Sequence, residues 1–393
     1  MTPRMLPWFY LLLLPLSIES ASDAVPSIET KHDNRNHIQE MINWLNSTEG
    51  GYLSPKVEVR RWNVSDSNSY FGVFAVEDLD EGELIMEMPK EIILQAEEIY
   101  QDTESNICEL AWMLQEEFEL GDESEFSPYI NYLKTQRRGQ LPAMWSDTGK
   151  TLLQKVVNET FETSKVVSWM DAWFGESCFH YEDLTLDEHL LALVMQRSFD
   201  THLIPIYDMI NHHAGKVNIY SEPNTATIAG QKKDFKAYTA SSIPAGGELF
   251  FHYYQNNGAP ETWGTIDILR DYGFVESYPR EFHFQLPELM TSFMVEKERM
   301  DTSNEVTLRW YNESFSHLPK GGIVHVVKEI ERLDDVYQEL MDHDKSVIPN
   351  SEMMTILQIH SALREALLLL VKSWESNIQS KMQLDAQSNT CTT

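Results

Sequence analysis

Three polar side chains interrupt an apolar run near the middle of the chain. Asp208, Asn211 and His212 lie within residues 203–213, whose other members are mostly aliphatic or aromatic. This pattern predicts the end of a buried strand or the loop that follows it. Buried polar groups need hydrogen bonds, made either within the protein or to a ligand. Considered alone, the segment is most simply explained as a self-satisfied polar network in the core.

Two later segments combine aromatic residues with glycine. Residues 243–254 indicate a turn followed by a strand that ends in Tyr253 and Tyr254. Residues 271–276 form a second such segment, which contains Tyr272. Aromatic residues in strands usually belong to the core, so their position along the chain decides whether they also serve a site.

Histidines near these segments raise the question of a metal site. The four candidates are His202, His212, His213 and His252. Their spacing matches no pair of ligands on one helix, and the three cysteines form neither a CxxC pair nor a zinc-type spacing. We therefore predict no metal. A histidine-based metal hydrolase remains a third hypothesis, behind the two given below. The cysteines allow at most one disulfide within the chain.

Hydrophobic periodicity divides the chain into alternating β-type and helical segments. A β-rich unit is interrupted by a long helical insertion and followed by a helical region, which indicates an α+β fold. The expected segments are a leader (1–24), a polar approach with an N-terminal helix (25–55), a first β-rich part (56–95), a helical insertion (96–195), a second β-rich part (196–285), a helical region (286–380) and a polar, frayed tail (381–393).

Five motifs along this arrangement occur in an order that is more specific than any one of them. They are the glycine and acidic turns of residues 69–89, the Tyr-Ile and Leu-Pro-Ala-Met-Trp marks of residues 129–146, the helix end at 194–198, the Asp-Met-Ile-Asn-His segment at 208–212, and the paired aromatic segments at 246–254 and 272–275. With them, residues from about 39 to about 285 resemble the SET-domain protein methyltransferases. The similarity is to the branch that contains the Rubisco large-subunit lysine methyltransferase.

The resemblance implies a β-rich SET fold with a pseudoknot, in which the Asn-His segment threads through a later loop. Residues 56–95 and 196–285 would be the two parts of the SET domain, and residues 286–380 would be a helical domain similar to the family's substrate-binding domain. The pseudoknot would explain how motifs 40 residues apart share one site.

The resemblance also implies S-adenosylmethionine as the cofactor. Arg197 would meet the cofactor's carboxylate, Phe274 would pack on its adenine, and Asp208 would steady the Asn-His loop. The residues implied at the cofactor site are Phe71, Gly72, Arg197, Asp208, Asn211, His212 and Phe274.

The implied reaction is methyl transfer to a side-chain nitrogen of a protein, with lysine as the default acceptor and histidine as an alternative. Tyr253 matches the family's catalytic tyrosine and Tyr272 would flank the lysine channel, although Tyr254 stays open as the tyrosine that faces the methyl group. The transfer needs an oriented, deprotonated amine, which an apolar channel favours because desolvation disfavours the ammonium form. The alternative function is a catalytically inactive SET-derived module that binds a basic partner.

The charge balance limits the choice of partners. Thirty basic against 62 acidic residues give a net charge of −32. Such a surface repels phosphate backbones and attracts Lys-rich polypeptides, so we expect a basic protein substrate and no nucleic acid. We expect a monomer.

The N-terminus has the pattern of a secretory signal peptide. Arg4 precedes an apolar run over residues 6–18, and small residues follow at 20–24. A run of thirteen residues is shorter than the roughly 20 that cross a bilayer core, so we expect cleavage and no membrane span in the mature chain; an uncleaved anchor is the less favoured alternative. We expect a glycoprotein of the secretory lumen or a secreted one; the alternative is a plastid or other organelle reached through a signal peptide. The sequons begin at Asn46, Asn63, Asn158 and Asn312.

Overall fold

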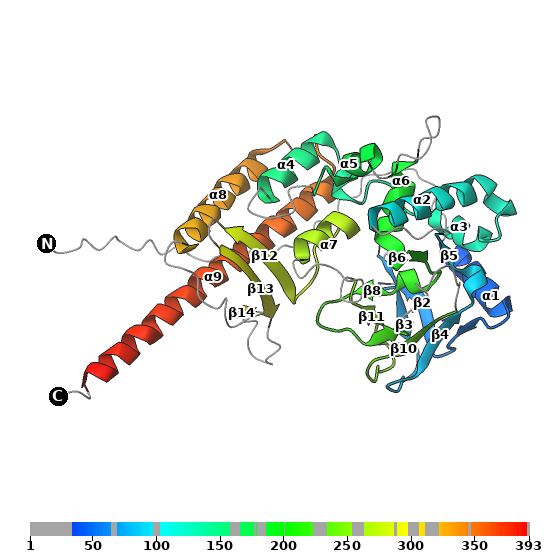
Figure 1. The fold of residues 1–393 in the computed structure, drawn as a ribbon, viewed down its shortest axis with the longest axis horizontal. Helices are drawn as coiled ribbons and strands as arrows, with labels where there is room; N and C mark the ends of the chain where they lie inside the picture. Colours follow the sequence, from blue (N-terminus) through cyan, green and yellow to red (C-terminus); the bar gives the residue numbers. More distant parts are fainter. Residues whose placement is uncertain are drawn as a thin grey trace. The chain divides into compact units, whose positions relative to one another are not determined.

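The first β-rich part of the chain contributes to three small sheets, two of which also contain strands from the second part. In the computed structural model, β1 (Tyr52–Leu53), β4 (Leu84–Met88), β10 (Phe235–Thr239) and β9 (Ile219–Ser221) make one antiparallel sheet in that order (Figure 1). β2 (Val57–Arg61) pairs with β3 (Phe71–Ala75), and β5 (Leu94–Gln95) and β6 (Ser198–Phe199) both pair with β7 (His202–Leu203). These pairings across the insertion confirm that one β unit is split. The structure describes residues 34–63, 69–96, 103–157, 166–176, 178, 186–199, 201–222, 234–253, 263–286, 289–297, 306–310, 322–344 and 347–390.

A short parallel pair brings together the two segments with the densest polar and aromatic chemistry. β8 (Asn211–His212) lies beside β11 (Phe250–Phe251), with Asn211 opposite Phe250. The carbonyl of Phe251 also accepts the amide of His213 at 3.1 Å. Segments about 40 residues apart in sequence therefore meet, as the expected pseudoknot requires.

The insertion is helical, as predicted. It contains α2 (Thr103–Leu120), α3 (Ser127–Leu133), α4 (Asp147–Val157), α5 (Trp169–Glu176) and α6 (Glu188–Arg197). Cys108 of α2 forms a disulfide with Cys178, which follows α5. Both cysteines are buried in one apolar cluster, the first core of the protein. Trp112 donates its indole N–H to the carbonyl of Cys178 at 3.2 Å. α2 packs against α3 and α6, and α1 (Asn34–Ser47) packs against α3.

The C-terminal region departs from the prediction in its first third. Residues 286–380 were expected to be helical, but β12 (Arg280–Leu286), β13 (Leu289–Lys297) and β14 (Val306–Trp310) form an antiparallel sheet. Phe282, Phe284 and Phe293 stack on one face of it and are fully buried. Only β13 and β14 lie in the region predicted to be helical. β12 lies almost entirely in the predicted second β-rich part, where buried Phe282 and Phe284 alternate with Glu281 and His283 in the two-residue period of a half-buried strand. In the opposite sense, α7 (Thr265–Tyr272) is a helix within the predicted second β-rich part.

Two helices complete the C-terminal region and form a second core. α8 (Gly322–Asp342) and α9 (Asn350–Thr390) pack on each other and on α4 of the insertion. Their buried side chains, among them Leu333, Ile356, Leu363 and Leu367, belong to one apolar cluster with Phe282 and Phe293. The insertion therefore contributes to both cores, so it is not a separate unit.

Helix α9 also corrects the expected frayed tail. The helix continues to Thr390, through most of residues 381–393. Its residues 350–376 are long and apolar enough to cross a membrane: the most apolar 18-residue stretch among them has a mean hydropathy of 1.4, and 44% of that stretch is buried inside the protein. Burial in the second core accounts for this apolar character. The expected leader, residues 1–24, lies outside the described residues.

Candidate active site

A cavity of about 30 Å³ lies where the end of α6, the Asp208 segment and β11 meet. Four residues singled out from the sequence line it, namely Arg197, Asp208, Tyr253 and Tyr272. Aromatic and aliphatic side chains supply most of the remaining wall. The full lining is Gln196, Arg197, Ser198, Phe199, Tyr207, Asp208, Ile210, Phe251, Tyr253 and Tyr272.

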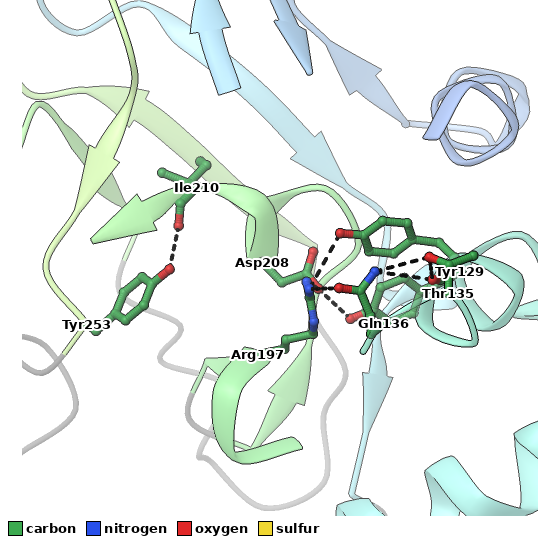
Figure 2. Close-up of polar contacts among 8 residues, drawn as sticks. Tyr129, Thr135, Gln136, Arg197, Asp208, Ile210 and Tyr253 are labelled. Carbon is green, nitrogen blue, oxygen red and sulfur yellow. Dashed lines mark hydrogen bonds and ion pairs between the residues drawn. The ribbon is translucent and has the colours of Figure 1, made fainter. Parts of the chain in front are cut away.

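One wall of the cavity is held by a buried ion pair. Arg197 Nη1 lies 2.9 Å from Asp208 Oδ2, and the same oxygen accepts the Tyr129 hydroxyl at 2.9 Å. Gln136 Oε1 accepts from the Arg197 guanidinium at 2.7 Å, and the Tyr132 ring lies under that guanidinium. Figure 2 shows Tyr129 and Arg197 pointing toward Asp208, with Gln136 beside Arg197. Both helix α3 and the turn after it thus reach from the insertion to the site.

The charges of this pair are strongly desolvated. The side chains of Asp208 and Arg197 are 1% and 16% exposed. Burial raises the pKa of Asp208, and the opposing attraction of Arg197 limits that rise. The other carboxylate oxygen, Oδ1, is buried without a hydrogen-bond partner among the described residues. This lone acceptor lies in a residue that lines the cavity, so the cavity suits a group that carries N–H donors.

Tyr253 and Tyr272 form the opposite wall, and their ring centroids are 4.4 Å apart. The Tyr253 hydroxyl donates to the carbonyl of Ile210 at 3.2 Å, as Figure 2 shows. Burial raises the pKa of both phenols well above the ordinary value of 10. Both side chains are therefore neutral hydroxyl groups at physiological pH. Tyr254 lies outside the described residues.

Next to this wall, Asn211 joins three chain segments. Its amide Nδ2 donates to the carbonyl of Phe71 at 2.9 Å and to Glu248 Oε1 at 2.8 Å. A Cβ added at Gly72 would lie 2.6 Å from Glu248 Oε1 and 2.8 Å from Asn211 Nδ2. Only glycine lets β3 approach this closely. The guanidinium of Arg61 covers the Phe71 ring at 4.3 Å from its centroid.

His212 makes a different set of contacts. Its Nε2 lies 2.8 Å from Glu276 Oε2, and its Nδ1 accepts the backbone N–H of Tyr253 at 3.2 Å. The other carboxylate oxygen of Glu276 accepts the Thr265 hydroxyl at 2.5 Å. The rings of His252, Tyr253 and Phe274 surround His212 at centroid distances of 5.1, 5.2 and 6.4 Å. Phe274 itself is 37% exposed.

The structure thus brings these sequence-predicted residues into one neighbourhood, which consists of the cavity and its flank. Arg197, Asp208 and the two tyrosines line the cavity, while Asn211 and His212 link to further residues on its flank. Asp208 is hydrogen-bonded to Arg197, and its predicted role in steadying the Asn-His segment stays a prediction. The role of Arg197 toward a cofactor carboxylate stays a prediction, since its described contacts are with protein groups.

Sequence reasoning missed two glutamates and the aromatic support from the insertion. Glu248 follows the Gly246-Gly247 turn of a segment that had been singled out, and Glu276 closes another. Their positions inside apolar, aromatic stretches were the available signal. Tyr129 was noted only as part of a motif, and its contact with Asp208 depends on a fold between residues 79 positions apart. Among the described residues, no three His, Cys, Asp or Glu side chains gather as they would around a metal ion.

Comparisons with known proteins place this geometry in a family. Residues 70–254 match the SET domain family. The N-lysine methyltransferase setd6 of Xenopus laevis is 24% identical over 303 residues, which cover 66% of this chain and 62% of that protein. The protein of the same name from Xenopus tropicalis is 24% identical over 267 residues, covering 58% of this chain and 55% of that protein. The matched part of the chain therefore spans less than two thirds of these relatives.

Solved structures show the same fold at low identity. The SET domain of LSMT bound to lysine and AdoHcy superimposes with a TM-score of 0.54 at 14% identity, covering 92% of this chain and 94% of that one. Rubisco LSMT bound to AdoMet gives a TM-score of 0.51 at 14% identity, with 89% and 93% covered. Residues 70–254 of the chain thus match a SET domain. The fold of the chain, including the helical insertion and the C-terminal region, is that of the Rubisco LSMT branch, which confirms the resemblance drawn from the five motifs.

Proposed function

We propose that this protein is an S-adenosylmethionine-dependent protein methyltransferase that acts on a side-chain nitrogen, with lysine as the acceptor. The observation that carries the proposal is the cavity itself. Two neutral phenols and an unpartnered carboxylate oxygen enclose a space suited to an amine, next to the Gly72–Asn211 contact. The curated relatives are named N-lysine methyltransferases, and the LSMT structures hold lysine, AdoMet and AdoHcy, which supports this choice.

The residues on the flank of the cavity fit the proposed cofactor. At Gly72 the chain leaves no room for a side chain, because Glu248 and Asn211 lie directly against this glycine. Asn211, His212, Phe71 and the half-exposed Phe274 would hold the cofactor there. When bound, S-adenosylmethionine supplies an electrophilic methyl group. The protein residues must orient the acceptor and exclude water.

The two tyrosines would act on the acceptor amine as neutral dipoles. Because burial raises the pKa of both phenols, neither is a base near pH 7. The amine must therefore reach the cavity already deprotonated, and desolvation between aromatic rings favours that form. Tyr253, held at its hydroxyl and its amide, would align the nitrogen lone pair, and Tyr272 would limit its movement. Histidine is the second acceptor that the same wall could orient.

The acceptor is expected to be basic, and the protein is expected to act in an oxidising compartment. The net charge of −32 favours a Lys-rich protein substrate over nucleic acid, and such pairing accelerates association. Cysteine pairs such as Cys108–Cys178 persist mainly in secretory and extracellular proteins. This supports the proposed signal peptide and a lumenal or secreted glycoprotein. The asparagines at 46 and 63 are exposed, and Asn158 and Asn312 lie outside the described residues.

A binding module without turnover is the second candidate, because of Tyr70. This residue stands where the family's first motif has a glycine, and its phenol hydrogen-bonds Glu248, the partner of Asn211. Desolvation and the Glu248 charge raise the pKa of Tyr70 to about 12. Its ring stacks on Trp62 at a centroid distance of 6.2 Å. A phenol held beside Asn211 could reduce the room left for a cofactor.

Calorimetric titration of S-adenosylmethionine and S-adenosylhomocysteine into the purified protein decides between these candidates. We expect micromolar binding of both, and weaker binding in Asn211→Ala. Tyr253→Phe should retain cofactor affinity while transfer of labelled methyl groups to basic secretory proteins falls by roughly 10²-fold, a loss typical of one positioned hydroxyl. Equal loss of cofactor binding in both variants would contradict this division of roles. No binding by folded protein would favour the module, and Tyr70→Gly would then be expected to restore it.

The chemical identity of the product tests the acceptor. Acid hydrolysis of the labelled proteins should release methylated lysine. Methylhistidine in its place would support the proposed methyltransferase activity but would show that the acceptor is histidine. Removal of N-glycans from protein secreted by cultured eukaryotic cells should increase its gel mobility, whereas unchanged mobility and an intact leader would contradict the proposed compartment.

A further inference from the structure

Glu276 is a buried glutamate to which no motif or comparison assigns a role. It is 3% exposed and lies just after α7, with one carboxylate oxygen toward His212 and the other toward Thr265. We propose that Glu276 is a positioning residue that acts through His212 to hold Tyr253 and, through Thr265, fixes helix α7 and the Tyr272 at its end. This inference rests on the proposed methyl transfer.

The hydrogen bonds define the tautomer of His212. Backbone N–H groups only donate, so the Nδ1 atom that receives the Tyr253 amide carries no proton. The ring proton must then be on Nε2, which donates it to Glu276 Oε2 at 2.8 Å. Without the glutamate, this buried N–H would have no acceptor in the same position. Glu276 therefore determines how the ring presents Nδ1 to Tyr253.

The same contacts use both carboxylate oxygens of Glu276. One oxygen accepts from an imidazole N–H and the other from the Thr265 hydroxyl, so both act as acceptors. Among the described residues, no Lys or Arg lies within ion-pair distance of this carboxylate; its only such contact is with His212. Burying a carboxyl group is costly, so its presence next to Tyr253 calls for an explanation beyond packing.

The geometry links Glu276 to both tyrosines of the cavity. Tyr253 is fixed at two points on one short segment, its amide on His212 and its hydroxyl on the carbonyl of Ile210. Thr265 begins the helix whose last residue is Tyr272. One carboxylate thus ties β8 to α7, and the tyrosine rings packed 4.4 Å apart are attached to these two elements.

Nitrogen NMR of the full chain labelled in its histidine rings tests the first step without any substrate. The His212 signals, assigned by their loss in His212→Asn, should show a protonated Nε2 and an unprotonated Nδ1. Glu276→Ala should shift these signals. Glu352→Gln is the matched control, because Glu352 is also buried and also accepts a hydroxyl, from Ser146, but far along the chain in α9; it should leave them unchanged. A His212 ring protonated on Nδ1 in the wild type would overturn the inference.

Kinetics separate positioning from mere stability. With a lysine-rich synthetic peptide as acceptor, Glu276→Ala should lower kcat about tenfold while the cofactor Kd changes less than threefold. Glu276→Gln, which keeps one acceptor oxygen for His212, should recover most of kcat, and Thr265→Val should lower it less than Glu276→Ala. A folded Glu276→Ala variant with wild-type kcat would refute the role. An inactive wild type with the expected His212 tautomer would instead count against the proposed function.

Discussion

Two buried polar clusters hold the site, and they balance charge in different ways. In the insertion-facing cluster, a cation and an anion meet directly, Arg197 with Asp208. In the cluster on β8 and α7, the carboxyl group of Glu276 faces the neutral donors His212 and Thr265. The ion pair of the first cluster connects the helical insertion, which carries Arg197, to the segment that carries Asp208. In the second cluster, Glu276 instead orients the His212 ring and the Thr265 hydroxyl.

Removing one acidic residue from each cluster should separate these roles most strongly. Asp208→Ala leaves the buried cation Arg197 unpaired and should cost about 3–5 kcal/mol of unfolding free energy. Glu276→Ala leaves only neutral donors unpaired and should cost about 1–3 kcal/mol. Denaturant titration of both variants measures the difference.

A double variant provides the control for the first cluster. Arg197→Met combined with Asp208→Leu replaces the pair by apolar groups and should regain most of the lost stability. Equal losses for Asp208→Ala and Glu276→Ala would show that the two clusters do not differ as described.

The disulfide should affect the first cluster and spare the second. Cys108–Cys178 closes a loop over 70 residues, and its removal by the double serine variant should cost about 2–4 kcal/mol. α2, which carries Cys108, packs on α3 and on α6, the helix that ends at Arg197. Hydrogen exchange should therefore accelerate in α6 and change little in α7. Equal acceleration in both helices would contradict this separation.

The smallest expected effect concerns pH and the second cluster. Burial lowers the pKa of His252, which lies edge-on to His212, to about 4 from an unfolded value near 6.5. Between these values the unfolded chain binds the proton and the folded one does not, so this residue lowers stability as pH falls. Asp267 has the opposite effect on stability: burial raises its pKa to about 6, so the folded chain binds this proton before the unfolded chain does, and stability increases as pH falls.

Melting temperatures at pH 7 and pH 5 test both signs. The decrease on acidification should be smaller in His252→Asn than in the wild type, and larger in Asp267→Asn. If the melting temperature of His252→Asn decreased as much as that of the wild type, His252 would not be the source of the predicted loss of stability.

The local sequence pattern was sufficient to predict much of the fold. The insertion helices follow from apolar spacing, and the split β unit follows from the order of β-type runs and turns. Where prediction failed, local signals conflicted with packing. Strands β13 and β14 were missed because they lie in a region that consists mostly of long helices, and α7 was missed between β-type segments. Both sets of residues are buried in the second core, which sequence periodicity did not reveal as a separate cluster.

The sequence by itself determined the residue types of the site and their order: Arg197, Asp208, Asn211, His212, Tyr253 and Tyr272. These residues could be inferred because their motifs occur in a recognisable order along the chain and because methyl transfer requires such side chains. Only the tertiary structure decided their partners. Asp208 bonds to Tyr129 across 79 positions, and His212 bonds to Glu276 across 64. Buried polar groups must find partners wherever the fold brings them, and such long-range pairings leave no periodic trace in the sequence.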